Sequence, residues 1–298
     1  MNGAIFNQLR IFQAIVAEGN ITNAAKRLQM APPSVSNALK SLEEDVGLPL
    51  FTRTTRSIEV TEAGKRLYDD ISTSMSELAF AYESISDLGK VPSGKVRLTI
   101  PRFVYVHYFQ PVYAEFCQRY PNIELEVSIS DANVDILNQG FDMGIRFGDR
   151  VEEGMVARRL TGAMHEALFA TPDYLEAFGT PKTPDDLKSH KLIQYRFIAS
   201  NQVAPLFLRG VASDITVEMP TALVVNDTDV MIDASLKGLG IGRIVEPVVA
   251  DLIASGELIP VLQDYWYPYS ELYVYFHKNA QKARRVRVMV DFLLEKFS

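Results

Sequence analysis

The chain has little cysteine, little histidine and no long apolar run, and each scarcity excludes a class of protein. Its single cysteine, Cys117, cannot form an intramolecular disulfide, and because it lies in the apolar segment 113–117 we expect it to be buried. The four histidines are scattered without ligand spacing, so no metal site is expected. No stretch of about 20 apolar residues occurs and none follows Met1. We therefore expect no membrane span, no signal peptide and a cytoplasmic protein.

Positive charge is also scarce, since the formal net charge is −7. The charge is unevenly distributed, however. Residues 1–66 contain eight Lys or Arg and six Asp or Glu, a net charge of +2, which leaves −9 for the rest of the chain. Only the N-terminal segment therefore has the charge to approach DNA, and the acidic remainder favours solubility.

The segment 20–64 has the pattern of a winged helix-turn-helix. Small residues at Ala24 and Ala25 allow a second helix to pack closely, residues 29–31 form a turn, and Pro32 suits the first turn of a new helix. Apolar residues then recur at helical spacing and predict an inward-facing stripe of Val35, Ala38, Leu39, Leu42 and Val46. Residues 51–60 are typical of a basic hairpin, the wing.

In such folds the N-terminal end of the second helix reaches base edges, while cations and hydroxyls contact phosphates. We therefore predict that DNA is contacted by Thr22, Pro32, Pro33, Ser34, Ser36, Asn37, Lys40, Arg53 and Arg56. The alternative is a small amphipathic bundle with solvated arginines. The coincidence of turn, wing and flanking helix favours DNA binding.

A single uninterrupted helical pattern runs over residues 62–88, with apolar residues every three or four positions. At about 1.5 Å per residue this helix spans roughly 40 Å. A stripe of that length needs a partner, most simply the same helix of a second subunit. Gly and Pro in residues 89–94 then end the helix and indicate a hinge.

Beyond residue 95 strands and helices alternate, which predicts an α/β domain. Strands are expected at 96–100, 123–129, 143–147 and 156–160, and helices at 105–119 and 133–139, in a parallel-sheet pattern. A second set follows, and strand 271–277 with helix 280–297 returns to the first. The predicted organisation is thus a DNA-binding domain at 1–61, a linker helix at 62–89, and a ligand-binding domain at 90–298. That last domain divides into subdomain I (about 94–164 and 270–298) and subdomain II (about 165–269).

Ligands of open α/β sheets bind beyond the carboxyl ends of strands, where helix N-termini offer free N–H groups. This rule selects Pro101, Arg102, Phe103, Asn133, Arg146, Phe147, Gly148, Tyr195, Asp227 and Thr228. As alternatives, Asn133, Asp227 and Thr228 cap helices, and Arg102 and Arg146 are ordinary surface charges. The arginines favour a carboxylate-bearing small molecule.

Other motifs lack the context that catalysis requires. The glycine-rich run 238–242 follows a helix and precedes a strand, the reverse of a nucleotide-binding loop, so it predicts a helix C-cap and a tight turn. Trp266, among tyrosines, indicates subdomain packing or a subunit contact rather than a stacking platform. With no nucleophile elbow and no acid pair, we expect no catalytic residues, no enzyme activity and no cofactor.

The N-terminal residues carry a family resemblance. The chain has Ala24-Ala25, Leu28, Val35-Ser36, Leu39, Leu42-Glu43, Val46-Gly47, Leu50-Phe51, Arg53 and Thr61-Glu62-Ala63-Gly64 in order. This pattern resembles that of the LysR-type transcriptional regulators. One departure is that many members have Ser-Gln-Pro where this chain has Ala31-Pro32-Pro33, so base preferences of glutamine-bearing members do not transfer.

The resemblance implies an N-terminal winged helix-turn-helix, a linker helix that dimerises antiparallel, and a two-subdomain effector domain like that of periplasmic binding proteins. It also implies a homotetramer, an inverted-repeat double-stranded DNA operator, RNA polymerase as a candidate partner, and a small-molecule effector between the subdomains. The competing classes are an enzyme or transport receptor on the same fold, and a purely structural DNA-binding protein.

Overall fold

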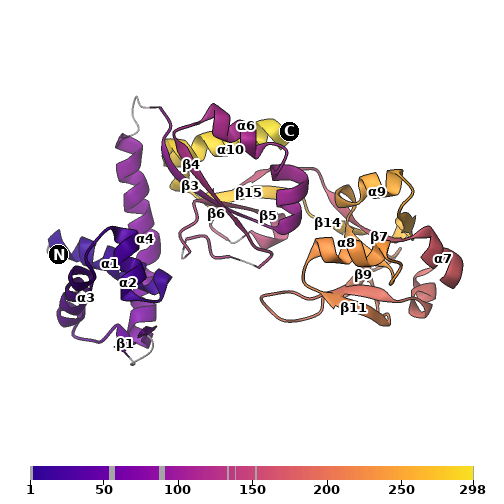
Figure 1. Ribbon diagram of the computed structural model, residues 1–298, viewed down its shortest axis with the longest axis horizontal. Helices are drawn as coiled ribbons and strands as arrows, with labels where there is room; N and C mark the ends of the chain where they lie inside the picture. The colour runs from indigo at the N-terminus through magenta and orange to yellow at the C-terminus, as the bar shows by residue number, and fades with distance from the viewer. Residues whose placement is uncertain are drawn as a thin grey trace. The chain divides into compact units, whose positions relative to one another are not determined.

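The computed structural model describes residues 3–53, 58–86, 91–132, 134–137, 139–151 and 153–297. The chain forms two compact units (Figure 1), residues 1–90 with 135–141, and residues 91–134 with 142–298. Among the described residues, no helix is both long enough and apolar enough to cross a membrane.

The N-terminal unit contains three short helices, a two-stranded hairpin and a long helix. Its elements are α1 (Gly3–Glu18), α2 (Ile21–Leu28), α3 (Pro32–Val46), β1 (Phe51–Arg53), β2 (Ile58–Val60) and α4 (Glu62–Ser86). Asn20 caps α2 by accepting the N–H of Asn23 at 2.7 Å, and Gln29 ends it in the left-handed conformation at φ 54°. The predicted turn at 29–31 and the helix that begins at Pro32 are confirmed.

The core of this unit forms where α1 and α3 meet. Its buried residues are Ile11, Phe12, Ala14, Ile15, Ala24, Ala25, Val35, Leu39, Leu42, Leu50 and Phe51. A fully buried side chain of this kind contributes about 1.5–3 kcal/mol. The predicted inward stripe is confirmed for Val35, Leu39 and Leu42, whereas Val46 is 43% exposed because α3 ends there and Gly47 turns the chain.

The long helix α4 has two different parts. Near its start Leu67 and Ile71 pack against the core of the N-terminal unit. Towards its end Leu78, Tyr82 and Ile85 are exposed, with 53%, 76% and 71% of their surfaces accessible. The predicted apolar stripe therefore continues beyond the core that could bury it. Leu88 and the residues 89–90 of the predicted hinge lie outside the described residues.

The second unit begins with a five-stranded sheet in the order β4-β3-β5-β15-β6. These strands are β3 (Gly94–Ile100), β4 (Ile123–Ile129), β5 (Met143–Phe147), β6 (Met155–Arg159) and β15 (Leu272–His277). Strand β3 runs parallel to β4 and β5, but β15 runs antiparallel to β5 and β6. The four strands of the predicted parallel pattern thus run in one direction, although β6 pairs with the antiparallel β15 rather than with one of the other three.

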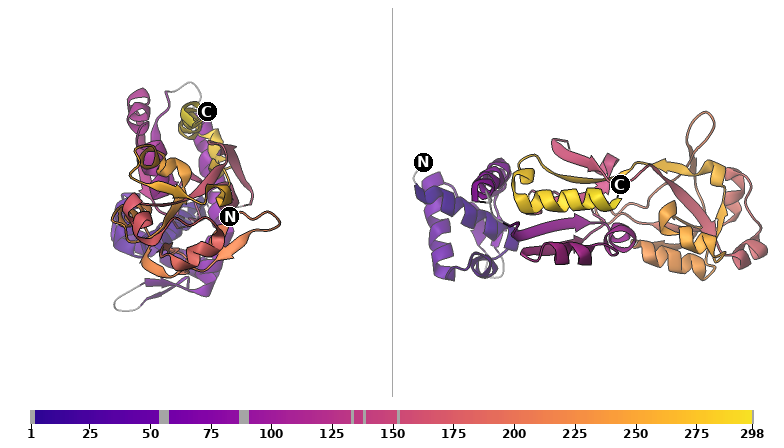
Figure 2. Two further views of the ribbon diagram at one scale, coloured as in Figure 1. Left: turned by 90° about the vertical axis from the view of Figure 1, so that its right-hand side faces the viewer. Right: turned by 90° about the horizontal axis from the view of Figure 1, so that it is seen from above.

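Two helices, α6 (Tyr113–Arg119) and α10 (Arg284–Phe297), cover one face of this sheet (Figures 1 and 2). They pack through Phe116 and Phe292, whose ring centroids are 5.3 Å apart. A further turn, η6 (Ala280–Lys282), precedes α10. The segment expected as the return helix therefore lies on the sheet that β15 joins.

Two predicted helices differ in the structure. The helix expected at 105–119 is divided into a π-turn, η1 (Tyr105–Phe109), and α6, because Pro111 lacks the N–H that a continuous helix needs. A short helix, α5 (Arg102–Val104), precedes them. None of the described residues of 133–139 is helical, and residues 136, 137 and 139 form turns. The prediction that Cys117 is buried was also wrong. It is exposed on α6, where Phe116 faces the core instead.

The second subdomain is built around β7 (Met164–Ala170), which pairs antiparallel with β12, β13 and β14. Its other strands are β8 (Leu192–Tyr195), β9 (Leu206–Leu208), β10 (Ile215–Val217), β11 (Thr221–Val225), β12 (Gly242–Val245), β13 (Ile259–Val261) and β14 (Tyr267–Tyr269). Its helices and turns are α7 (Pro172–Phe178), η3 (Pro184–Ser189), α8 (Thr228–Leu236), η4 (Glu246–Val248), α9 (Ala250–Ala254) and η5 (Gln263–Tyr265). The turn η2 (Gly148–Arg150) lies instead between β5 and β6 of the five-stranded sheet. Strands β8 and β11 pair parallel, and β9 and β10 antiparallel.

Two minor predictions for this subdomain can be checked. Gly238 follows α8 at φ 71°, and Leu239 donates its N–H to the carbonyl of Ala234, which confirms the predicted helix C-cap. Trp266 is buried, and its Nε1–H donates to the carbonyl of Val261 at 3.0 Å. Its role is therefore packing inside the subdomain.

Candidate DNA interface and ligand cavity

One face of α3 presents polar side chains to solvent. Pro32, Pro33, Ser34, Asn37 and Lys40 are exposed, and Ser36 is half-buried behind them. Among the described residues the side chains of Ser34, Ser36 and Asn37 make no hydrogen bond. Donors and acceptors that are exposed and unpaired at the start of a helix are free to meet base edges or phosphates.

The cation and hydroxyl predicted beside that face are also accessible. Lys40 Nζ lies 3.5 Å from Glu44 Oε1 in an exposed pair, which costs little to exchange for a phosphate. Thr22 is exposed on α2. Arg53 ends β1 opposite Ile58, whereas Arg56 lies outside the described residues.

Two residues of the family pattern, Glu43 and Gly64, hold the hairpin against α3. Glu43 Oε1 accepts the N–H groups of Leu50 and Phe51 at 2.8 and 3.2 Å. A Cβ at Gly64 would collide with the carbonyl oxygen of Leu50, so only glycine fits there. Thr61 Oγ1 accepts the N–H of Gly64 at 3.0 Å and donates to the carbonyl of Pro49 at 2.8 Å. These contacts fix where the wing emerges.

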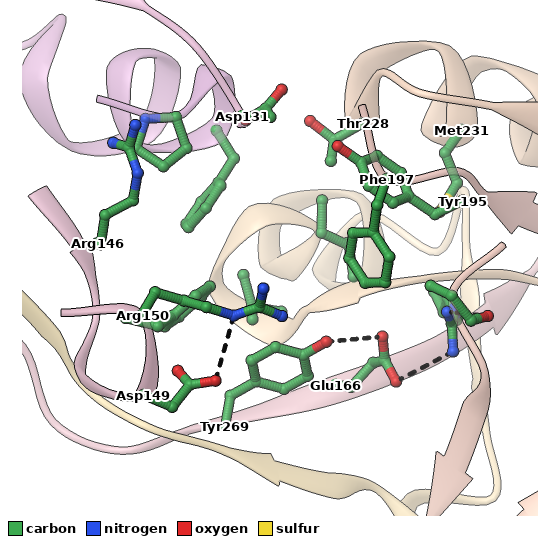
Figure 3. Close-up of a pocket in the computed structure, with 17 residues that line it drawn as sticks. Asp131, Arg146, Asp149, Arg150, Glu166, Tyr195, Phe197, Thr228, Met231 and Tyr269 are labelled. Atoms are coloured by element: carbon green, nitrogen blue, oxygen red, sulfur yellow. Dashed lines mark hydrogen bonds and ion pairs between the residues drawn. The ribbon is translucent and has the colours of Figure 1, made fainter. Parts of the chain in front are cut away.

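A cavity of about 180 Å³ lies in the second unit, between the five-stranded sheet and the second subdomain (Figure 3). Its walls come from the ends of β3, β5 and β8, the start of α8, and β7, β12 and β14. It is lined by Pro101, Phe103, Asp131, Arg146, Phe147, Asp149, Arg150, Glu166, Tyr195, Phe197, Ala204, Thr228, Met231, Arg243, Ile244, Val245 and Tyr269.

Six of the residues selected from the sequence line this cavity: Pro101, Phe103, Arg146, Phe147, Tyr195 and Thr228. Pro101, Phe147 and Tyr195 lie at, or directly after, the carboxyl end of a strand, and Thr228 is the first residue of α8. Arg146 is one residue before the end of β5, and Phe103 lies in the short helix α5 that follows β3. The hydroxyl of Thr228 is buried and has no partner among the described residues. Burial raises the pKa of Tyr195 to about 12, and Asp131 and Asp227 add to the shift.

Three other selected residues lie outside the lining, and each has a different role. Arg102 Nε is 2.9 Å from Asp229 Oδ2, in an ion pair. Asp227 caps α8, because its Oδ1 accepts the N–H groups of Asp229 and Val230 at 2.9 and 3.1 Å. Gly148 packs against the ring of Tyr273, where a Cβ would collide. Asn133 lies outside the described residues.

Arg146 is buried rather than an ordinary surface charge. Its guanidinium donates to four carbonyl oxygens, those of Thr99, Ile145, Ser130 and Ala132, at 2.8–3.2 Å. Its Nε–H has no partner among the described residues. Burial lowers the pKa of Arg146, and Tyr275 and Asp131 act in the opposite direction. The side chain therefore joins β3, β5 and the loop 130–132, and brings positive charge to the cavity.

At the other end of the cavity lies a buried acid that the sequence pattern did not indicate. Glu166 Oε2 is 3.7 Å from Arg243, and Glu166 Oε1 accepts the hydroxyl of Tyr269 at 3.4 Å. Arg243 also donates to the carbonyls of Ala204 and Pro205 at 2.9 and 2.7 Å. Burial raises the pKa of Glu166, and Arg243 partly offsets the increase. Burial and Glu166 likewise raise the pKa of Tyr269.

In the described part of the chain, no group of three or more His, Cys, Asp or Glu side chains could hold a metal ion. The cavity instead offers rings, three arginines and three acids. That set suits the binding of a small organic molecule more than its conversion.

Comparison with known proteins extends over both units. The family described as "Bacterial regulatory helix-turn-helix protein, lysR family" matches residues 6–65, and the "LysR substrate binding domain" matches residues 89–298. The uncharacterized HTH-type transcriptional regulator YhjC of Escherichia coli (strain K12) is 33% identical over 96% of this chain and 95% of its own.

Two solved structures have the same fold over nearly the whole chain. CrgA, a LysR-type transcriptional regulator from Neisseria meningitidis, is 25% identical with a TM-score of 0.63, and 98% of each chain is covered. Full-length LysG from Corynebacterium glutamicum, solved with its effector arginine bound, is 21% identical with a TM-score of 0.64, and 99% of each chain is covered.

Proposed function

The chain belongs to the LysR family of DNA-binding transcriptional regulators, and on this premise we propose that α3 and the β1–β2 wing contact the operator while a carboxylate-bearing small molecule in the cavity controls that contact. Regulators of this family are not enzymes. The observation that supports the proposal is the exposed face of α3. Among the described residues, the side chains of Ser34 and Asn37 make no hydrogen bond there, and Lys40 is paired with Glu44, which is itself exposed.

The DNA contacts we propose are the ones that the sequence selected. Ser36, Asn37 and Lys40 face the major groove, Thr22, Pro32, Pro33 and Ser34 lie at the approach to it, and Arg53 and Arg56 of the wing meet phosphates or the minor groove. Because the start of α3 has prolines rather than glutamine, Asn37 is the strongest candidate for a bidentate contact to a base.

A second subunit completes the proposed assembly. The exposed side chains of Leu78, Tyr82 and Ile85 on α4 fit a helix–helix dimer, which demands an inverted-repeat operator. Two such dimers would join through their effector domains into a tetramer. A protein that acts on DNA in this way works in the cytoplasm, with RNA polymerase as a partner at the promoter.

For the effector, the cavity supports a small anion. Arg146, Arg150 and Arg243 line it, and the first residues of α8 border it. LysG was solved with arginine as its effector, an amino acid with one carboxylate and two cationic groups, and this supports a small carboxylate-bearing ligand in this fold without indicating its net charge. The residues proposed to contact it are Pro101, Phe103, Arg146, Phe147, Tyr195 and Thr228, and Arg102, Asn133, Gly148 and Asp227 remain in the proposal as the other contacts that the sequence selected.

The DNA part of this proposal is tested by fluorescence anisotropy of the full-length protein on a random duplex over a salt series. Affinity should fall steeply with salt, because bound phosphates release counterions. Arg53→Ala should flatten the log–log slope by about 0.9, the contribution of one phosphate, whereas Arg159→Ala on β6 should leave it unchanged. An affinity that does not depend on salt would contradict the proposal.

A further inference from the structure

Aromatic rings line the cavity on both sides. Phe103 and Phe147 are stacked with centroids 5.4 Å apart, and Phe147 continues to Tyr269 at 5.2 Å. Across the cavity Tyr195 and Phe197 meet edge to face at 5.8 Å. Rings on opposite walls favour a flat apolar guest, because aromatic pairs gain energy beyond the area that they bury.

The volume limits the size of that guest. About 180 Å³ is less than the ~300–1,000 Å³ of pockets that hold drug-sized ligands. One six-membered ring with a small substituent is therefore of suitable size, whereas two fused rings are too large for the cavity as it stands.

The three arginines of the lining differ in their freedom to bind an anion. Arg146 and Arg243 are buried, and their guanidinium groups already donate to backbone carbonyls. Arg150 follows β5 and has 46% of its side chain exposed. Its Nε lies 3.3 Å from Asp149 Oδ2, on the adjacent residue. Figure 3 shows its guanidinium directed into the middle of the cavity.

Arg150 is also oriented by the far wall. Its guanidinium carbon lies 5.6 Å from the ring centroid of Phe197, which belongs to the loop after β8. A guanidinium that lies over a ring keeps its N–H edges free, and these edges match a carboxylate in a two-point contact. Asp149 is 62% exposed, so it can return to water at little cost when another anion takes its place.

The charges of the cavity lining determine how many negative charges the ligand can carry. Three acids (Asp131, Asp149, Glu166) and three arginines line the cavity. With Asp131 and Glu166 both ionised, release of Asp149 to solvent leaves one positive charge to be matched, so a single carboxylate neutralises the site. A second negative charge would be buried without a free cation, which is costly.

We propose that the effector is an aromatic monocarboxylate with one ring, and that Arg150 is the residue that binds its carboxylate, in exchange for Asp149. The ring lies between the Phe103–Phe147 pair and the Tyr195–Phe197 pair. This inference rests on the proposed function, since it specifies the ligand of the same cavity, and it assigns the anion contact to a residue that the strand-end rule did not select.

The test is isothermal titration calorimetry of the full-length protein with four probes. Benzoate should bind at least tenfold more tightly than cyclohexanecarboxylate, which lacks the aromatic ring, succinate, which adds a charge, and 1-naphthoate, which adds a ring. Arg150→Gln should lower the affinity for benzoate at least tenfold, and Arg150→Lys should lower it less. Arg158→Gln, at an exposed position of β6, should bind benzoate with the affinity of wild type. Thermal melting without ligand verifies that each variant is folded.

Three results would overturn the inference. Equal affinity for cyclohexanecarboxylate, succinate or 1-naphthoate would contradict the ligand class, and wild-type affinity of a folded Arg150→Gln protein would contradict the role of Arg150. If none of the four acids bound while the same preparation bound DNA with a steep salt dependence, the inference would fail and the proposed function would stand. Absence of DNA binding would instead contradict the proposed function.

Discussion

Glu166 has an environment that differs from that of an ordinary, solvated carboxylate. It is buried in the cavity wall, and its partners Arg243 and Tyr269 come from β12 and β14, the strands that pair with β7. Burial disfavours the charged form and raises its pKa, so the native protein holds this proton more tightly than the unfolded chain does. Stability should therefore depend on pH through this one side chain.

The sign of that dependence is fixed by the raised pKa. The contribution of neutral Glu166 is fully present below the pKa of the unfolded state, and it is lost as pH rises through the higher pKa of the folded state. We expect the melting temperature of Glu166→Gln to be close to that of wild type at pH 5 and to rise above it as the pH increases to 8. Each tenfold difference in proton affinity corresponds to about 1.4 kcal/mol. Melting curves at both pH values measure this, with the exposed Glu176→Gln as control. A wild-type-to-variant difference independent of pH would contradict it.

Asn37 is the residue on which we expect base preference to depend. It is exposed on α3, and its amide can make a bidentate contact to adenine. Asn37→Ala should relax selectivity at one or two operator positions, at a cost of about 1–3 kcal/mol for each lost contact. Competition binding with single-base operator variants measures this, and Asn7→Ala on α1 is the matched control. Unchanged selectivity in Asn37→Ala would remove this residue from the readout.

At this scale the strand-end rule could find only part of the cavity lining. Pro101, Phe147 and Tyr195 lie where parallel strands β3, β5 and β8 end, and such ends are marked in the sequence by the strand pattern itself. Glu166 and Arg243 lie within antiparallel strands instead. Only tertiary pairing brings them to the cavity, so no local pattern could select them.

At the scale of elements, α4 is the helix whose sequence demands more than the N-terminal unit provides. Leu67 and Ile71 find partners in the core, whereas Leu78, Tyr82 and Ile85 are left in solvent. Burial of an apolar side chain stabilises a protein by about 1.5–3 kcal/mol, and a symmetric helix pair buries each of these positions in both subunits. The exposed half of α4 is therefore the strongest candidate for a subunit contact.

Placing charge in that half should dissociate the protein. Leu78→Asp with Ile85→Asp would put four acids into a symmetric interface, and we expect dimer dissociation to become at least a hundredfold easier, because buried like charges lack partners. Sedimentation velocity measures the mass, and Thr73→Asp, exposed on the same helix, is the control. A double variant with the mass and DNA affinity of wild type would exclude α4 as the interface.

The elements themselves were predictable where their periodicity is long. The winged helices and α4 repeat their apolar residues over several turns, and their bounds agree with the pattern. The break between η1 and α6 depends on one proline inside an otherwise continuous apolar pattern. Strands β9, β10, β13 and β14 have three residues each, too few to show a period, and they were missed for that reason.

For the whole molecule, two segments of opposite charge have different proposed roles. Residues 1–66 carry +2 and hold the proposed DNA face, while the remainder carries −9 and encloses the cavity. A ligand can alter DNA binding only if it has different affinity for two arrangements of the protein. The fold class was predictable because the motif of the N-terminal helices covers a long ordered segment. The identity of the ligand depends on side chains from many strands and was not.

The most direct test of the central claim is selection of bound sequences from a random duplex pool by the full-length protein, with and without benzoate. We predict enrichment of an inverted repeat whose half-sites lie about one helical turn, ~10 base pairs, apart, because a symmetric dimer presents two α3 helices at that spacing. Benzoate should change the affinity for the selected site. A pool that stays random after repeated rounds, or that yields an isolated half-site, would contradict the account of a dimeric, sequence-specific regulator.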